Sequence, residues 1–165
     1  MNKEVIGGAD GPTSVFLAAD WMDWFNVLGL FVMICVLLPN IIYAIKFKGV
    51  KNKCTSKVMN ILEQVGRYAC MILMVFCIGM RSFGFFSLEE CLIYLLGNIF
   101  LIIVYWIIWL LYFVKQKAWK SMALAILPTA IFLLSGITQR HFLLIIAATI
   151  FGVAHIYVTY KNIRD

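Results

Sequence analysis

The sequence predicts an all-α integral membrane protein, a bundle of five transmembrane helices, and three observations lead to that fold class. First, 64% of the 165 residues are apolar and only 13% are charged, whereas soluble domains are roughly half apolar and a quarter charged. Second, five apolar stretches reach the length of about 20 residues that a helix needs to cross a bilayer. Third, lysine and arginine gather on one side of these stretches, as they do in membrane proteins.

The five expected helices cover approximately residues 24–45, 58–86, 91–114, 121–138 and 142–160. The third stretch is the most uniformly apolar, and it and the first are the plainest transmembrane segments. Only Gln139, Arg140 and His141 separate the fourth from the fifth, which predicts a tight helical hairpin. We expect residues 22–165 to form one membrane domain, preceded by an extracytoplasmic segment at residues 1–21.

The second stretch differs from the others because it contains two arginines. Arg67 and Arg81 are 14 residues apart, which is about 21 Å along a helix axis and shorter than the hydrocarbon core of about 30 Å. A charge must therefore lie deep in this helix. We expect Arg67 to lie in the inner interfacial zone, either snorkelling to the surface or paired.

The basic residues predict the orientation of the bundle. Eleven lysines and arginines fall on one side of the expected helices, namely Lys46, Lys48, Lys51, Lys53, Lys57, Arg67, Lys115, Lys117, Lys120, Lys161 and Arg164. Lys3, Arg81 and Arg140 fall on the other side. By the positive-inside rule the side with eleven is cytoplasmic, so the N-terminus is outside and the C-terminus inside.

This distribution also explains the positive net charge of +6 without a nucleic-acid partner, because the basic residues form the cytoplasmic rim of a membrane protein. We expect the loop between Lys46 and Lys57 to contact anionic lipids of the inner leaflet. The expected location is the cytoplasmic membrane of a bacterium.

Polar residues within the apolar stretches indicate candidate sites, because such residues are costly in lipid. Asn60, Glu63, Gln64 and Arg67 follow one another at helical spacing, which places them in one stripe on the second helix. Glu63 and Arg67 are four residues apart, a spacing suited to an ion pair. A polar stripe in a transmembrane helix is expected to face protein or a water-filled space.

Two other helices carry polar residues at a similar depth. Asn40 and His155 each lie six residues from the basic end of their helix, at Lys46 and Lys161, which is about 9 Å along the axis. One hypothesis is that Asn40, Glu63, Arg67 and His155 converge on a polar pocket open to the cytoplasm. The alternative is structural: an ion pair at the interface, with His155 hydrogen-bonded across helices.

The N-terminal segment has an unusual composition, with glycines, a carboxylate and a proline in the run Ile6-Gly-Gly-Ala-Asp-Gly-Pro-Thr-Ser-Val-Phe16. This run resembles the Gly-Ala-Asp-Gly-Pro-Thr signature of the β subunit of sodium-translocating decarboxylases. The resemblance implies a role in sodium binding for Asp10, with Thr13 as a neighbouring ligand. It covers about ten residues, and the chain is too short to be the complete decarboxylase subunit.

The segments Leu38–Lys46 and Ile61–Tyr68 resemble small bacterial membrane proteins of no known function, a resemblance that implies the architecture alone. We find no pairing of a nucleophile with a base and no metal-ligand or phosphate-binding spacing, so we expect no enzyme activity and no cofactor. The function expected first is that of an accessory protein, with a membrane-protein partner or a second copy as its contact. The alternative is transport, or binding of a small ligand or ion, with a sodium-linked role for the N-terminal motif.

Overall fold

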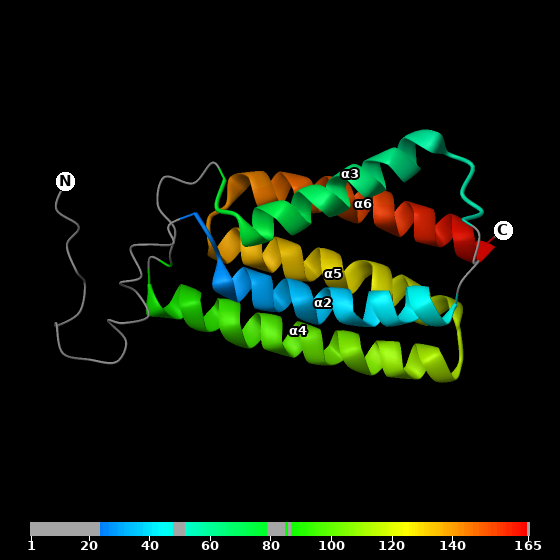
Figure 1. Cartoon of the computed structure of the whole chain (residues 1–165), viewed down its shortest axis with the longest axis horizontal. Helices are drawn as coiled ribbons and strands as arrows, with labels where there is room; N and C mark the ends of the chain where they lie inside the picture. The colour runs from blue at the N-terminus through cyan, green and yellow to red at the C-terminus, as the bar shows by residue number, and fades with distance from the viewer. Residues whose placement is uncertain (1–23, 48–51, 79–84, 86, 165) are drawn as a thin grey trace, which may run out of the picture.

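The computed structural model describes residues 24–47, 52–78, 85 and 87–164. This part of the chain forms five helices, shown in Figure 1: α2 (Val27–Lys46), α3 (Lys57–Val75), α4 (Leu88–Val114), α5 (Ala118–Thr138) and α6 (Phe142–Arg164). All five are long and apolar enough to cross a membrane. The expected all-helical architecture is therefore confirmed for the described residues, whereas the segment 1–21, with Asp10 and Thr13, lies outside them.

Three of the helices begin at a side chain that caps the first turn. The Asn26 side chain accepts a hydrogen bond from the Gly29 amide at 2.8 Å, and the Ser87 hydroxyl accepts one from the Glu90 amide at 3.1 Å. Ser56 caps α3 in the same way through the Met59 amide. Such caps satisfy amides that have no partner within the helix, which is why these polar residues precede the apolar runs.

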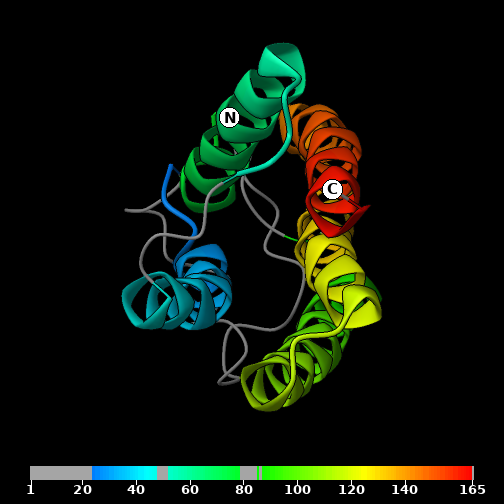
Figure 2. The ribbon, with the colours of Figure 1, turned by 90° about the vertical axis from the view of Figure 1, so that its right-hand side faces the viewer.

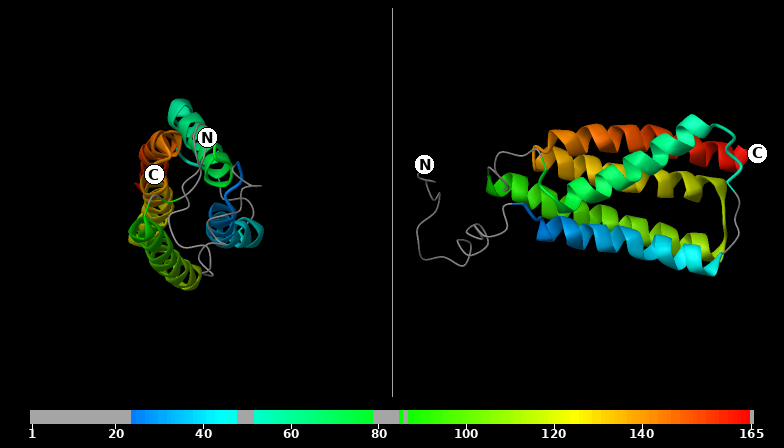
Figure 3. Two further views of the ribbon diagram at one scale, coloured as in Figure 1. Left: turned by 90° about the vertical axis from the view of Figure 1, so that its left-hand side faces the viewer. Right: turned by 45° about the horizontal axis from the view of Figure 1, so that its top comes forward.

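The helices form a closed ring in the order α2, α3, α6, α5 and α4, seen end-on in Figure 2. α6 packs along both α3 and α5, and α5 also packs along α4. α2 completes the ring through less extensive contacts with α3 and α4. Figure 3 shows α3 crossing the bundle obliquely beside α6. The sequence neighbours α3 and α4 therefore lie on different sides of the ring, and the C-terminal helix is its central packing element.

Close approach of α3 to α6 depends on a glycine. A methyl group added at Gly66 would lie 2.9 Å from the Cα atom of Phe151, closer than real carbon atoms pack. The backbones of the two helices can therefore meet only because residue 66 has no side chain. At Gly152 on α6 the missing side chain leaves room for the side chain of Thr129 on α5.

The second helix is shorter than the range 58–86 expected from the sequence. α3 ends at Val75, and the following residues are extended beside residues 24–26. The Asn26 amide donates to the Val75 carbonyl at 2.7 Å, and the Cys77 amide donates to the Trp24 carbonyl at 2.9 Å. The apolar sequence after Val75 is thus used in pairing with the start of α2, and α3 still has 19 residues, about 28 Å of helix.

The two ends of the bundle differ in charge. At the end where α2, α4 and α6 finish, the described residues include eight lysines and arginines outside the middle of the helices: Lys46, Lys53, Lys57, Lys115, Lys117, Lys120, Lys161 and Arg164. We call this the basic end; it lies at the right of Figure 1. At the opposite end, Arg140 pairs with Glu90 at 2.6 Å.

Candidate functional site

The candidate site is centred on a buried carboxylate between α3 and α6. Glu63 is only 6% exposed, and its Oε1 atom accepts hydrogen bonds from two basic side chains. One donor is Nη2 of Arg67, one turn further along α3, and the other is Nδ1 of His155 on α6, at 2.9 Å. A carboxylate buried in an apolar helix is costly unless its oxygens are paired, so this pairing explains how Glu63 is tolerated.

The packing of α3 on α6 brings His155 to Glu63. Gly66, three residues after Glu63, lies directly against the backbone of Phe151. The Phe151 ring stacks on the His155 imidazole, with 4.9 Å between the ring centroids and an interplanar angle of 16°. One glycine contact therefore sets the distance between the helices, and the stacked ring orients the imidazole toward the carboxylate.

The contact with Glu63 determines where His155 carries its proton. An ionised carboxylate only accepts hydrogen bonds, so Nδ1 must be the donor to Oε1. In the neutral imidazole the other nitrogen, Nε2, then carries the lone pair. The His155 side chain is 20% exposed, and a proton taken up at Nε2 would give this imidazole a positive charge.

Arg67 has hydrogen-bonding capacity beyond its contact with Glu63. Its side chain is 39% exposed, and the bond to Glu63 uses one of the five N–H groups that a guanidinium carries. The remaining N–H groups are of the kind that bind carboxylate or phosphate oxygens.

The structure brings together three of the four residues predicted to converge, Glu63, Arg67 and His155, and places Asn40 differently. The Asn40 amide donates to the Tyr105 hydroxyl at 2.7 Å and to the Val36 carbonyl at 2.8 Å. The described hydrogen bonds of Asn40 therefore join α2 to Tyr105 on α4 and do not reach Glu63.

The four residues of the polar stripe predicted on the second helix differ in their depth along α3 and in the direction in which they point. Asn60, nearer the basic end, bonds to Asn52 at 2.9 Å and to the Cys54 carbonyl at 3.0 Å, so it holds the segment before α3. Gln64 is exposed on the outer side of α3. Of the stripe, only Glu63 and Arg67 take part in the site.

Two features of the structure were not predicted from the sequence. Tyr105 is 1% exposed within the most apolar helix, and its hydroxyl was the one available signal, since a buried tyrosine usually needs a polar partner. The second feature is a cluster of buried polar side chains at the end opposite the basic end: Asn26, Tyr94, Asn98, Ser135 and Gln139. Tyr94 and Asn98 are four residues apart on α4, and Ser135 and Gln139 are four residues apart at the end of α5. No spacing along the sequence relates these two pairs to each other or to Asn26.

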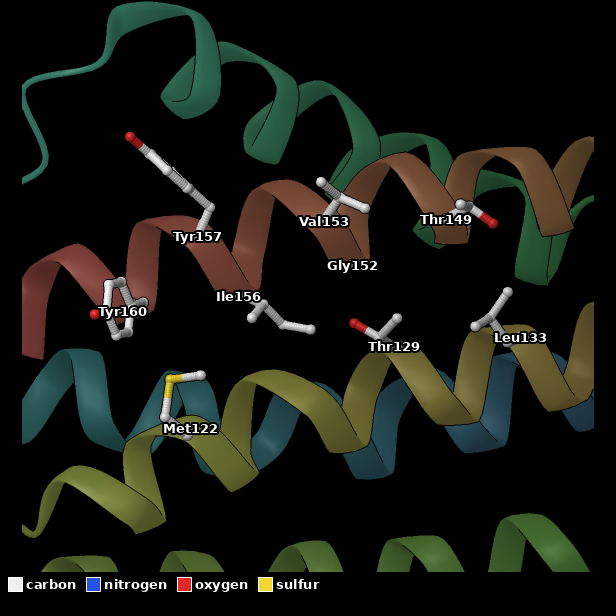
Figure 4. Close-up of a pocket in the computed structure, with 9 residues that line it drawn as sticks. All are labelled: Met122, Thr129, Leu133, Thr149, Gly152, Val153, Ile156, Tyr157 and Tyr160. Atoms are coloured by element: carbon white, nitrogen blue, oxygen red, sulfur yellow. The ribbon is translucent and has the colours of Figure 1, made fainter.

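A surface hollow of about 590 Å³ lies along α5 and α6, on a different face of α6 from His155. Figure 4 shows the hollow, with Thr129 and Thr149 toward one end and Tyr157 and Tyr160 toward the basic end. The two threonine hydroxyls bond to carbonyls of their own helices. The hollow is therefore an apolar surface, separate from the charged site.

Comparisons with known proteins give no family for this chain. It matches no protein-family model, and neither the curated proteins nor the solved structures contain a significant match. Within the part of the chain that the structure describes, no three His, Cys, Asp or Glu side chains group closely enough to hold a metal ion. A function for this chain is therefore proposed from the geometry of Glu63, Arg67 and His155.

Proposed function

We propose that this chain is a ligand-binding protein of a bacterial cytoplasmic membrane. Its ligand is a small anion that reaches the site from the cytoplasmic side. The single observation that carries the proposal is the pairing of buried Glu63 with both Arg67 and His155. Ionisable groups within a transmembrane helix are uncommon and usually functional. A small carboxylate or phosphate suits the unused N–H groups of Arg67.

The orientation in this proposal rests on the distribution of charge. The eight described basic residues at the basic end favour the cytoplasmic side for that end. They also favour contact with the anionic lipids of the inner leaflet. Glu63 is six residues from Lys57 at the start of α3, about 9 Å along the helix, so the site lies within reach of the cytoplasmic surface.

The charges of the site also predict how an anion binds. With His155 neutral, the carboxylate of Glu63 offsets the guanidinium of Arg67, and the cluster has no net charge to attract an anion. A proton at Nε2 of His155 makes the cluster positive by one charge. Tyr105 on α4 and Asn40 on α2 carry no charge, so they do not alter this balance. Anion binding is therefore expected to be accompanied by uptake of a proton.

The proposal is tested by calorimetry on the purified chain in nanodiscs, with acetate, succinate and inorganic phosphate as probes and acetamide as the neutral control. Arg67→Gln should weaken binding of the anion about 10-fold to 100-fold, because a charge-assisted hydrogen bond usually contributes that much to affinity. Arg140→Gln, which removes an arginine at the opposite end, is the matched control and should leave affinity unchanged. Equal affinities in the parent and in Arg67→Gln would contradict the proposal.

The accessory role and the sodium-linked role expected from the sequence stay predictions. An accessory protein should copurify with the same membrane partner whether Arg67 is present or replaced by glutamine. A sodium-linked role predicts a rise in the thermal unfolding temperature with Na⁺ but not with K⁺, because a ligand that binds the folded state stabilises it. That rise should disappear in Asp10→Asn.

A further inference from the structure

The hollow between α5 and α6 (Figure 4) has walls suited to an apolar guest. No charged side chain is among the residues that line it. The hydroxyls of Thr129 and Thr149 already bond to carbonyls of their own helices, so they require no polar partner from a guest. Val153 in the lining is 62% exposed, so the hollow opens on the surface of the bundle, where lipid can enter it.

The hollow is about as long as one leaflet of a bilayer is thick. Its wall on α6 runs from Thr149 to Tyr160, and its wall on α5 runs from Met122 to Leu133. Each wall spans 11 residue steps, about 16 Å along a helix axis, and half of a hydrocarbon core is about 15 Å. The Thr149 end is near the middle of α6, and the Tyr160 end is one turn before Arg164. The hollow therefore spans the leaflet at the basic end.

Two basic side chains follow the hollow where it reaches the basic end. Tyr157, Tyr160 and Arg164 recur at helical spacing on α6, so Arg164 continues the line of the two tyrosines that line the hollow. Lys161 comes directly after Tyr160, and Arg164 is exposed. Arg164 lies about 6 Å beyond Tyr160 along the axis, which is the level of the lipid headgroups when the tyrosine lies at the interface. A guanidinium there is suited to phosphate oxygens.

We propose that one anionic phospholipid of the leaflet at the basic end binds here, with an acyl chain in the hollow and its phosphate at Lys161 and Arg164. The apolar walls accept the chain of any phospholipid, and the two cations select an anionic one. A transmembrane helix of a partner would pack along about 30 Å, whereas the hollow covers about half of that length. This lipid site is separate from the anion site at Glu63.

The proposal is tested by thermal unfolding of the purified full chain in dodecylmaltoside micelles. Dioleoylphosphatidylglycerol is the anionic probe, and dioleoylphosphatidylcholine, with the same acyl chains, is the zwitterionic control. The anionic lipid should raise the unfolding temperature up to a plateau, because a ligand of the folded state stabilises it. The control lipid should give a much smaller rise at the same concentration.

Val153→Trp tests whether the acyl chain lies in the hollow. The indole ring takes part of the space of the chain, so the anionic lipid needed for half of the rise should increase about tenfold. Ile103→Trp is the matched control, because Ile103 is 53% exposed on α4 and lines neither hollow. Ile103 lies as far from Val114, at the basic end of α4, as Val153 lies from Arg164. The control should respond to the lipid as the parent does.

Replacing Lys161 and Arg164 together by glutamine tests the headgroup contact. The lipid concentration for half of the rise should increase about tenfold to thirtyfold. Lys46→Gln combined with Lys115→Gln removes the same charge from the same end of the bundle and should have little effect. Equal effects of the two pairs would show attraction to the basic end as a whole, and would overturn the proposal of a single site.

The remaining outcomes separate this site from the alternatives. Arg67→Gln should leave the lipid response unchanged, and loss of the response in that variant would place the headgroup at Glu63. Equal responses to the two lipids would mean that the hollow holds bulk lipid without selection. A dimer that Val153→Trp dissociates, with no response to the anionic lipid, would identify a second copy as the occupant. Each of these three results would overturn the proposal.

Discussion

At the scale of single residues, Glu63 holds the candidate site together because one oxygen accepts from two basic side chains. Sequence spacing was enough to predict its pairing with Arg67, since positions four apart meet on one helix face. The proximity of Glu63 to His155 was predicted only from the similar depth of the two residues in the membrane. Tyr105 and the orientation of Asn40 could not be predicted, because cross-helix partners depend on how the helices rotate about their axes.

Glu63→Gln tests the role of the carboxylate at this scale. The substitution preserves the shape of the side chain but leaves Arg67 without its counter-charge, and breaking a buried pair commonly costs about 3–5 kcal/mol. Because Arg67 is 39% exposed and so partly screened, we expect a loss of about 2 kcal/mol in the free energy of unfolding. Denaturant titration measures it.

The matched control for that substitution is Glu89→Gln. Glu89 is exposed in the first turn of α4, where a helix-dipole contribution of at most about 0.3–1 kcal/mol is expected. Equal losses of stability in the two variants would show that the buried pairing of Glu63 contributes nothing specific.

At the scale of the helices, the contact between α3 and α6 positions the site. The five helices were predictable from apolar length alone, but the early end of α3 was not. Residues 76–78 are as apolar as the helix before them, and they leave the helix because their backbone pairs with residues 24–26. A tertiary contact of this kind overrides what a hydropathy pattern can show.

Gly66→Ala tests the contact between the helices. The added methyl group meets the backbone of Phe151, which cannot move without displacing α6, so the free energy of unfolding should fall by about 1–3 kcal/mol. His155 should also separate from Glu63, and affinity for the anion should fall with it.

Gly97→Ala provides the comparison for Gly66→Ala. At Gly97 the added methyl group meets only the end of the Leu134 side chain, which can rotate away. Thermal unfolding and anion titration of both variants measure the difference. Unchanged affinity in Gly66→Ala would show that the approach of α6 to α3 does not position the site.

At the scale of the whole molecule, charge and packing together define a bundle with two unlike ends. The basic end carries lysines on the α2–α3 and α4–α5 connections and at the end of α6, and the opposite end contains the buried neutral cluster around Tyr94 and Gln139. The charge asymmetry was predictable by counting residues. The neutral cluster was not, because its members meet only when three helices are assembled.

The orientation of the molecule is tested by cysteine labelling in a variant whose five native cysteines are replaced. Lys115→Cys, between α4 and α5, should react with an impermeant maleimide only from the cytoplasmic side. Ser87→Cys, at the start of α4, should react only from outside. Labelling from the reversed sides in intact cells and inverted vesicles would contradict the orientation given by the positive-inside rule.

The most direct test of the central claim is the number of protons taken up when the anion binds. Calorimetric titrations with succinate in buffers of different ionisation enthalpy give this number, and we expect about one proton per anion, taken up at Nε2 of His155. In His155→Gln the proton uptake should vanish. Anion binding without proton uptake in the parent protein, or uptake that persists in His155→Gln, would contradict the account.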